Sequence, residues 1–142
     1  MKPILMIAYH YPPEGSSSGV LRTLKFSKYL PRHDWAPHIL TLREGVYRVR
    51  DEGLRSDIPP EAHVHRTRGF DSTRALSIRG RHVAMFSVPD PLIGWLPFGI
   101  SRGLSVVRRF GVRALFSTSP VPTAHLIAGA LKRLTEIGRA HV

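Results

Sequence analysis

The chain opens with Lys2-Pro3-Ile4-Leu5-Met6-Ile7-Ala8, which is followed by Tyr9-His10-Tyr11-Pro12-Pro13-Glu14-Gly15-Ser16-Ser17-Ser18-Gly19. Residues 2–8 form a short apolar run, which is typical of a strand buried on both faces. The prolines and glycines of residues 9–19 can continue neither a strand nor a helix. Residues 20–30 then take helical spacing, with several apolar side chains on one side. We therefore predict a strand, a loop and a helix in this order.

This first loop is a candidate binding site because of its position. Open α/β sheets bind ligands beyond the carboxyl ends of their strands, and the N–H groups that begin a helix favour an anion such as phosphate. Gly19 lets the backbone come close to the helix or to a diphosphate, or it simply makes the loop flexible. Ser17 and Ser18 either bind phosphate or sugar hydroxyls or cap the helix. His10 either contacts an acceptor or is an ordinary loop residue.

The rest of the chain continues the alternation of strands and helices. We predict strands over 37–42, 63–67 and 112–117, and helices over 100–107 and 123–134, the former ended by Gly111. Residues 43–60 read as a surface loop, and residues 70–85 fit no single pattern. Alternation of this kind implies parallel strands with right-handed crossovers. The predicted fold is α/β, a Rossmann-like parallel sheet with helices on both faces, in one domain over residues 1–135.

The C-terminal end departs from this pattern. A doubly wound domain should continue with another strand after the last helix, so the predicted sheet is incomplete at the C-terminus and stops at four strands. Residues 136–142 resemble the in-frame translation of a common sequencing adapter, which predicts a non-native tail on a truncated reading frame. An ordinary disordered tail is the alternative. Deleting a non-native tail should leave the melting temperature unchanged.

The charge is the unusual feature of the composition. The 142 residues include 21 Lys and Arg against 10 Asp and Glu, a formal net charge of +11, and no cysteine. The excess of arginine reflects either a GC-rich genome or an acidic partner. No nucleic-acid-binding motif accompanies it, so we expect no nucleic acid. No apolar segment is long enough to cross a bilayer and no signal peptide is recognisable, which together with the lack of cysteine favours the cytoplasm.

Three segments together carry a resemblance to a known family. They are the strand of residues 4–8 with Tyr11-Pro12-Pro13 and the loop 16–19, the segment Pro89-Asp90-Pro91 with Gly94-Trp95 and Pro97-Phe98, and the segment 117–126. In this order and spacing, residues 2–135 resemble the N-terminal half of a GT-B glycosyltransferase of the large retaining family-four group.

The resemblance implies transfer of a sugar from a nucleotide-diphosphate donor to an acceptor, which is expected to be lipid-linked or part of an envelope glycan. In that group the N-terminal domain chiefly binds the acceptor, whereas a C-terminal domain binds most of the donor and carries a Glu-rich signature. The present chain lacks that second domain. The resemblance therefore implies a missing donor-binding partner domain, no cofactor bound by this domain, and a fragment that is inactive by itself.

The fourth predicted strand leads into a second candidate loop. The hydroxyl groups of Ser117, Thr118 and Ser119 either bind substrate oxygens or cap the following helix. His125, in the first turn of that helix, is a candidate to hydrogen-bond a sugar hydroxyl or phosphate. Asp90 either accepts from an acceptor hydroxyl or serves as a turn residue. We assign no catalytic residue, and the histidine spacing predicts no metal site.

Two further features point to a membrane. Arg22 begins a stripe of cations at helical spacing with Lys25, Lys28 and Arg32, which either faces an anionic membrane on the inner side of the cell or is simply solvated. Trp95 and Phe98 either lie at a membrane interface or acceptor groove or pack on the core.

Two other classes of function compete with sugar transfer. A nucleotide-cofactor oxidoreductase would carry G-x-G-x-x-G directly after the first strand, and the serine-rich loop with Pro12-Pro13 does not fit this pattern. The alternative that remains is a non-enzymatic basic α/β domain that binds anionic membrane or nucleic acid, with steep salt dependence.

Overall fold

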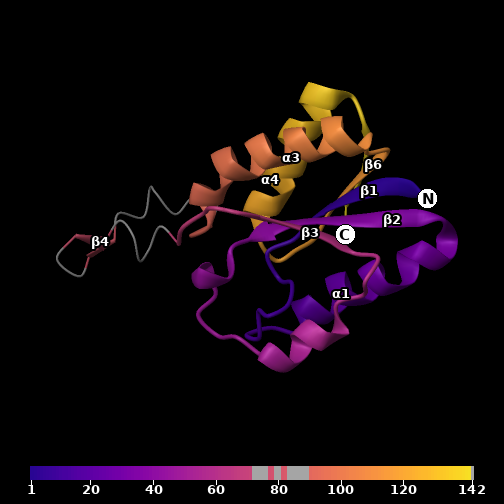
Figure 1. The fold of residues 1–142 in the computed structure, drawn as a ribbon. Helices are drawn as coiled ribbons and strands as arrows, with labels where there is room; N and C mark the ends of the chain where they lie inside the picture. Colours follow the sequence, from indigo (N-terminus) through magenta and orange to yellow (C-terminus); the bar gives the residue numbers. More distant parts are fainter. Residues whose placement is uncertain (72–76, 79–80, 83–89, 142) are drawn as a thin grey trace.

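The computed structural model describes residues 1–71, 77–78, 81–82 and 90–141, with side-chain surroundings for 1–71 and 90–137. A five-stranded sheet lies at the centre of the domain, in the order β3-β2-β1-β6-β7 (Figure 1). Every neighbouring pair of strands in this sheet is parallel. The strands are β1 (Lys2–Ile7), β2 (Trp35–Leu42), β3 (His63–Thr67), β6 (Ala114–Ser117) and β7 (Gly138–His141).

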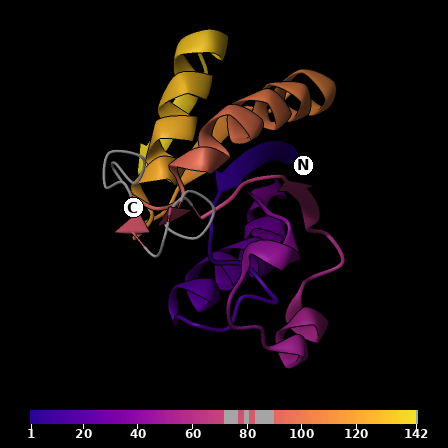
Figure 2. The same ribbon diagram turned by 90° about the vertical axis from the view of Figure 1, so that its left-hand side faces the viewer.

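Helices cover both faces of this sheet. The helix α1 (Gly19–Tyr29) lies on one face, and α3 (Leu96–Phe110) and α4 (Pro122–Thr135) lie side by side on the other (Figures 1 and 2). Two short strands, β4 (Ser77–Ile78) and β5 (Arg81–His82), pair with each other antiparallel in a separate ribbon. Short segments of 3-10 helix span Leu30–His33, Glu44–Val46, Glu52–Asp57 and Ile93–Trp95.

The alternation of side chains along β1 divides the core into two clusters. Leu5 and Ile7 point to the face covered by α3 and α4, whereas Met6 packs on the opposite face with Leu24 of α1. The side chains of Leu5, Met6 and Ile7 are all fully buried. The apolar run predicted as a buried strand is therefore the central strand, as its composition indicates.

Two glycines allow α3 and α4 to pack closely. A Cβ atom on Gly99 would lie 2.5 Å from Cδ1 of Ile127, and one on Gly103 would lie 2.5 Å from Cδ1 of Leu131. Gly111 then ends α3 in the left-handed region at φ 63°, and its N–H donates to the carbonyl of Val107.

The predicted fold class and element order are confirmed. The structure moves several predicted ends: β2 begins earlier, at Trp35, and α3 begins earlier, at Leu96, whereas β6 begins later, at Ala114. The expected loop over 43–60 contains two short segments of 3-10 helix. Of the unassigned stretch 70–85, only 70–71, 77–78 and 81–82 are described, and Pro89, in the second segment of the family resemblance, lies outside the described residues.

The structure differs from the prediction after α4. Glu136 ends this helix in the left-handed region at φ 57°, and residues 138–141 pair parallel with β6 as a fifth strand. Parallel pairing uses backbone groups, and β6 offers an open edge there, so a segment without an apolar pattern can still extend the sheet. The sheet thus does not stop at four strands. That residues 136–142 are non-native stays a prediction, and Val142 lies outside the described residues.

Candidate functional site

The loops after β1 and β6 lie at the same edge of the sheet. The two strands pair parallel, with Ile7 opposite Ser117, so both loops leave from their carboxyl ends. The N–H of Thr118 donates to the carbonyl of Ile7 over 3.4 Å. Arg22, near the start of α1, reaches across and donates from Nη1 to Oγ1 of Thr118 at 3.4 Å. Ser18 and Ser119 therefore belong to one edge.

A buried carboxylate organises the first loop from inside. Glu14 is 1% exposed, and its Oε2 lies 2.7 Å from Nδ1 of His10. Its Oε1 accepts from the N–H of Ser16 at 2.7 Å and from the hydroxyl of the same serine. These donors compensate for the loss of water around the carboxylate. His10 is thus 8% exposed and engaged within the loop, where the structure uses it to bind Glu14.

Gly19 marks the place where α1 begins against the first loop. A Cβ atom there would lie 3.2 Å from Cδ2 of His10 and 3.3 Å from Oγ of Ser17, so glycine permits a close approach. The N–H of Gly19 donates to Oγ of Ser17 at 3.0 Å. Ser18 is the N-cap residue, yet its side chain makes no capping hydrogen bond and is exposed. Its hydroxyl is thus open to solvent at the helix N-terminus.

A histidine organises the second loop. Nδ1 of His125 lies 2.8 Å from Oγ of Ser117, and Nε2 lies 3.3 Å from Oγ of Ser119. Ser117 is fully buried, whereas Ser119 is exposed and His125 half-buried. A neutral imidazole has one donor and one acceptor nitrogen, and a serine hydroxyl can take either role, so Nδ1 and Nε2 of His125 play opposite parts towards Ser117 and Ser119. The exposed hydroxyl of Ser119, together with the half-buried His125, can therefore exchange a hydrogen bond with a ligand hydroxyl.

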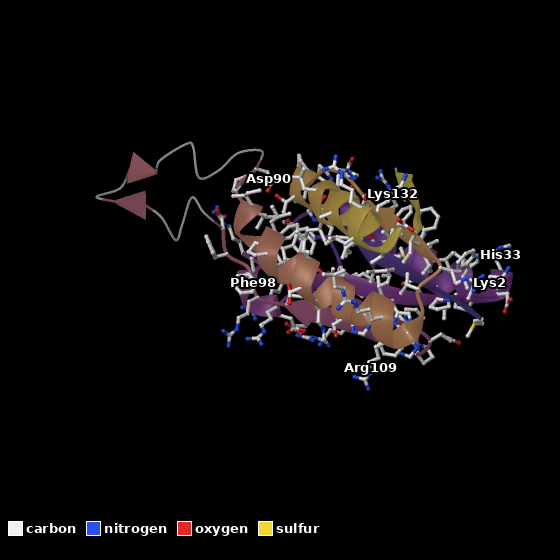
Figure 3. The ribbon with its side chains drawn as sticks, turned by 90° about the horizontal axis from the view of Figure 1, so that it is seen from above. Lys2, His33, Asp90, Phe98, Arg109 and Lys132 are labelled. Atoms are coloured by element: carbon white, nitrogen blue, oxygen red, sulfur yellow. The ribbon has the colours of Figure 1, made fainter. Side chains whose placement is uncertain are left out.

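Asp90 occupies the amino end of α4 rather than an open surface. Its Oδ2 accepts from the N–H and the hydroxyl of Thr123, at 2.7 and 2.8 Å, and its Oδ1 accepts from the N–H of Leu92 at 2.7 Å. Figure 3 shows Asp90 and Phe98 at the end of the molecule opposite Lys2 and His33. The contact with the N–H of Leu92 is local to the turn, whereas the contacts with Thr123 connect the segment before α3 to α4.

The cationic stripe of α1, which continues into the 3-10 segment Leu30–His33, is exposed over its whole length. Arg22, Lys25, Lys28 and Arg32 are all exposed, and the guanidinium of Arg32 lies 5.0 Å from the ring centroid of Tyr29. Trp95, by contrast, is fully buried and donates from Nε1 to Oγ1 of Thr67 at 3.0 Å, so it packs in the core. Phe98 is 40% exposed.

Two kinds of feature are absent from the described part of the chain. Within it, no group of three or more His, Cys, Asp or Glu is arranged to bind a metal. No helix among these residues combines the length and apolarity required to span a bilayer.

Sequence reasoning found most of this edge and missed Glu14. Because they follow predicted strands, Ser17, Ser18, Gly19, the serines of the second loop and His125 could be predicted as candidate site residues. Glu14 lies between Pro13 and Gly15 in a stretch without periodicity, and nothing in the pattern distinguishes a buried loop carboxylate from an exposed one.

The fold defines the class as a Rossmann-like α/β domain, and the candidate site lies at the carboxyl ends of its strands. Two solved structures share this fold across 99% of the chain. Sucrose-phosphate synthase from Thermosynechococcus elongatus matches with a TM-score of 0.64 at 12% identity, and a glycosyltransferase from Rickettsia africae matches with 0.52 at 14%.

The chain spans only 32% and 29% of those two structures, about a third of each. The Rossmann-like α/β fold expected from the sequence is therefore one that the chain shares with part of each of these two structures. No protein-family model and no curated protein matches the chain.

Proposed function

We propose that this chain is the acceptor-side N-terminal domain of a GT-B glycosyltransferase of the family-four type. The observation that carries the proposal is the pairing of β1 with β6, which places two serine-bearing loops and the N-termini of α1 and α4 at one edge. Both solved structures with this fold bear the names of sugar-related enzymes, and one is titled a glycosyltransferase.

The chain's own residues support binding and orientation of sugar hydroxyls. His125 and Ser119 lie within hydrogen-bond distance of each other and together can hydrogen-bond a sugar hydroxyl. The exposed Ser18 lies at a helix N-terminus that favours anions. Arg22 adds a positive charge beside the second loop. We assign no proton transfer to these groups. The donor, a nucleotide-diphosphate sugar, is a substrate, and its departing diphosphate would be stabilised by basic groups and helix N-termini.

The finer features of the proposal rest on the sequence resemblance. They are transfer with retained configuration, a lipid-linked or envelope-glycan acceptor, and a peripheral position on the inner face of the cell membrane. The exposed stripe of α1 favours the last of these, because each cation near an anionic surface contributes about 1 kcal/mol. We propose that a separate donor-binding domain completes the enzyme, so that the present chain alone is inactive.

A second candidate function is a non-enzymatic basic domain that binds anionic membranes. The formal charge of +11 and the exposed stripe of α1 favour it. Such a domain would bind anionic vesicles with steep salt dependence and would have no activity towards nucleotide sugars in any longer form of the protein.

The reading frame in a longer stretch of the source DNA tests the proposal. We expect it to continue into a second α/β domain with an acidic signature, and we expect the complete protein to release nucleoside diphosphate from one of a panel of nucleotide sugars when a membrane extract supplies acceptors. A reading frame that stops at once, or continues into an unrelated fold, contradicts the proposal.

A further inference from the structure

A second surface at the carboxyl edge of the sheet carries concentrated positive charge. A groove of about 520 Å³ lies between the end of β3 and the exposed side of α3. Its lining includes four arginines, Arg43, Arg66, Arg68 and Arg102. We call it the basic groove. None of the residues that line it in the described part of the chain is acidic.

Three elements fix the positions of these arginines. Arg43 directly follows β2, and its N–H donates to the carbonyl of Thr67 at the end of β3 over 2.8 Å. The hydroxyl of Thr67 accepts from the buried indole of Trp95, so the floor of the groove joins the core. Arg102 approaches from the exposed side of α3. The groove is thus built on ordered strand ends and a helix.

Arg66 differs from the other three arginines in its partners. It donates from Nη1 to the carbonyl of Leu42 at 3.0 Å and from Nη2 to the carbonyl of Pro12 at 2.5 Å. Its Nε also lies 3.8 Å from Oε1 of Glu44. These contacts make Arg66 a support that connects β2, β3 and the first loop, and leave it little capacity for a ligand.

Arg43, Arg68 and Arg102 are exposed and form no ion pair with any residue that the structure describes. Neighbouring arginines do pair where an acid is near: Arg48 with Asp71, and Arg55 with Glu44 and Glu52. Three like charges around one groove repel one another, and an anion bound between them removes that repulsion. The local charge therefore calls for an anionic partner that the described residues do not supply.

We propose that the basic groove binds the phosphate group of a ligand. The planar guanidinium fork matches phosphate oxygens in a bidentate manner, and Arg43, Arg68 and Arg102 surround the groove from three elements. Ser101 adds a hydroxyl donor on α3, and the partly exposed ring of Phe98 offers an apolar contact for the organic part of the ligand. The inference stands apart from the proposed sugar transfer, because phosphate binding is measurable on this chain alone.

The phosphate belongs either to a soluble phosphorylated compound or to a phospholipid headgroup, and one experiment separates these sources. Inorganic pyrophosphate and a hexose 6-phosphate are titrated into the ¹⁵N-labelled chain, and amide shifts are followed at residues 67–68 and 101–105 and at 16–19. In parallel, binding is measured to phosphatidylcholine vesicles with and without phosphatidylglycerol. Each measurement is repeated on Arg68→Gln/Arg102→Gln and on the charge-matched control Arg108→Gln/Arg113→Gln.

We expect saturable shifts at the groove, with affinity at least about tenfold weaker in Arg68→Gln/Arg102→Gln and unchanged in the control. Arg68→Lys/Arg102→Lys should recover part of the binding, because the charge remains but the fork is lost. Response to the soluble compounds assigns a soluble ligand, and response only to anionic vesicles assigns a headgroup. The proposal would be overturned by an equal loss of affinity in Arg68→Gln/Arg102→Gln and in the control Arg108→Gln/Arg113→Gln. Binding that leaves the groove amides unshifted would overturn it as well. All four substituted arginines are exposed, and circular dichroism checks that the variants fold.

Discussion

Glu14 places a carboxylate inside the first loop at 1% exposure, where His10 and Ser16 surround it with donors. Glu14→Ala removes the acceptor for these groups and leaves the buried ring of His10 without this partner. We expect the free energy of unfolding to fall by about 1–3 kcal/mol. Urea denaturation measures it, with the exposed Glu61→Ala as the control, expected within about 0.5 kcal/mol of the parent. An equal effect of both substitutions would mean that the loop does not depend on Glu14.

Two histidines at the edge of the sheet predict a pH dependence of stability. Nδ1 of His38 lies 3.0 Å from Nε2 of His65, and both rings are buried. Burial, together with His63, lowers the pKa of His38 to about 4. Burial lowers the pKa of His65 to about 4 as well, with smaller contributions from His38, Arg102, His63 and Arg109.

Because these pKa values lie below the ordinary value of about 6.5, the unfolded chain binds more protons between pH 6.5 and 4. The free energy of unfolding should therefore have its maximum value above pH 7 and fall as the pH drops from 6.5 to 4. Urea unfolding at pH 7.5, 5.5 and 4.5 measures this slope. His38→Gln/His65→Gln should flatten it, whereas the exposed His33→Gln should not. A slope that the histidine pair does not alter would contradict the assignment.

The location of a single residue in the fold could be predicted from the sequence where the residue directly follows a predicted strand. Serines, a glycine and a histidine directly after predicted strands had to reach the carboxyl edge, and they do. The roles of His10 and Asp90 within the structure could not be read in advance, because their partners Glu14 and Thr123 are brought near them only by the loop path. The basic groove was equally hidden, since its arginines come from three separate segments.

Asp90 connects two elements that are far apart in sequence. Its Oδ2 binds both the N–H and the hydroxyl of Thr123, in the first turn of α4. Asp90→Ala should lower the free energy of unfolding by about 1–2 kcal/mol, as loss of a helix cap does. Thr123→Val should cost less, because the N–H contact survives, and the double variant should cost less than the sum of the two. Asp57→Ala, at an exposed position, is the control for urea denaturation. Additive effects would show that the two residues act separately.

The elements themselves were largely predictable from hydrophobic pattern and from Gly and Pro. The strand over 63–67 and the helix ended by Gly111 coincide with β3 and the end of α3. The start of α3 was not predictable, because Pro97 within an apolar, proline-rich segment looks like a loop until the first helical turn accommodates it. The pairing of 138–141 was missed because it uses backbone rather than a side-chain pattern.

For the whole molecule, the sequence and the structure give opposite expectations for deletion of residues 136–142. A non-native tail predicts no change in melting temperature, whereas pairing of β7 with β6 predicts a decrease, since deletion opens the edge of β6. The structure therefore predicts a lower melting temperature and a tendency to self-associate. Differential scanning calorimetry and analytical ultracentrifugation measure the two effects. An unchanged, monomeric chain would favour the interpretation as a dispensable tail.

The most direct test of the account asks whether the edge shared by β1 and β6 binds the substrate. It measures the turnover of nucleotide sugar by the complete protein and compares two substitutions on α4. His125→Ala removes the imidazole that contacts Ser117 and Ser119, whereas Lys132→Ala changes an exposed residue further along the same helix. We predict that kcat/KM for release of nucleoside diphosphate falls at least about tenfold in His125→Ala, as expected for loss of a hydrogen bond to substrate, and is unchanged in Lys132→Ala. Equal kcat/KM in the parent and His125→Ala would contradict the account.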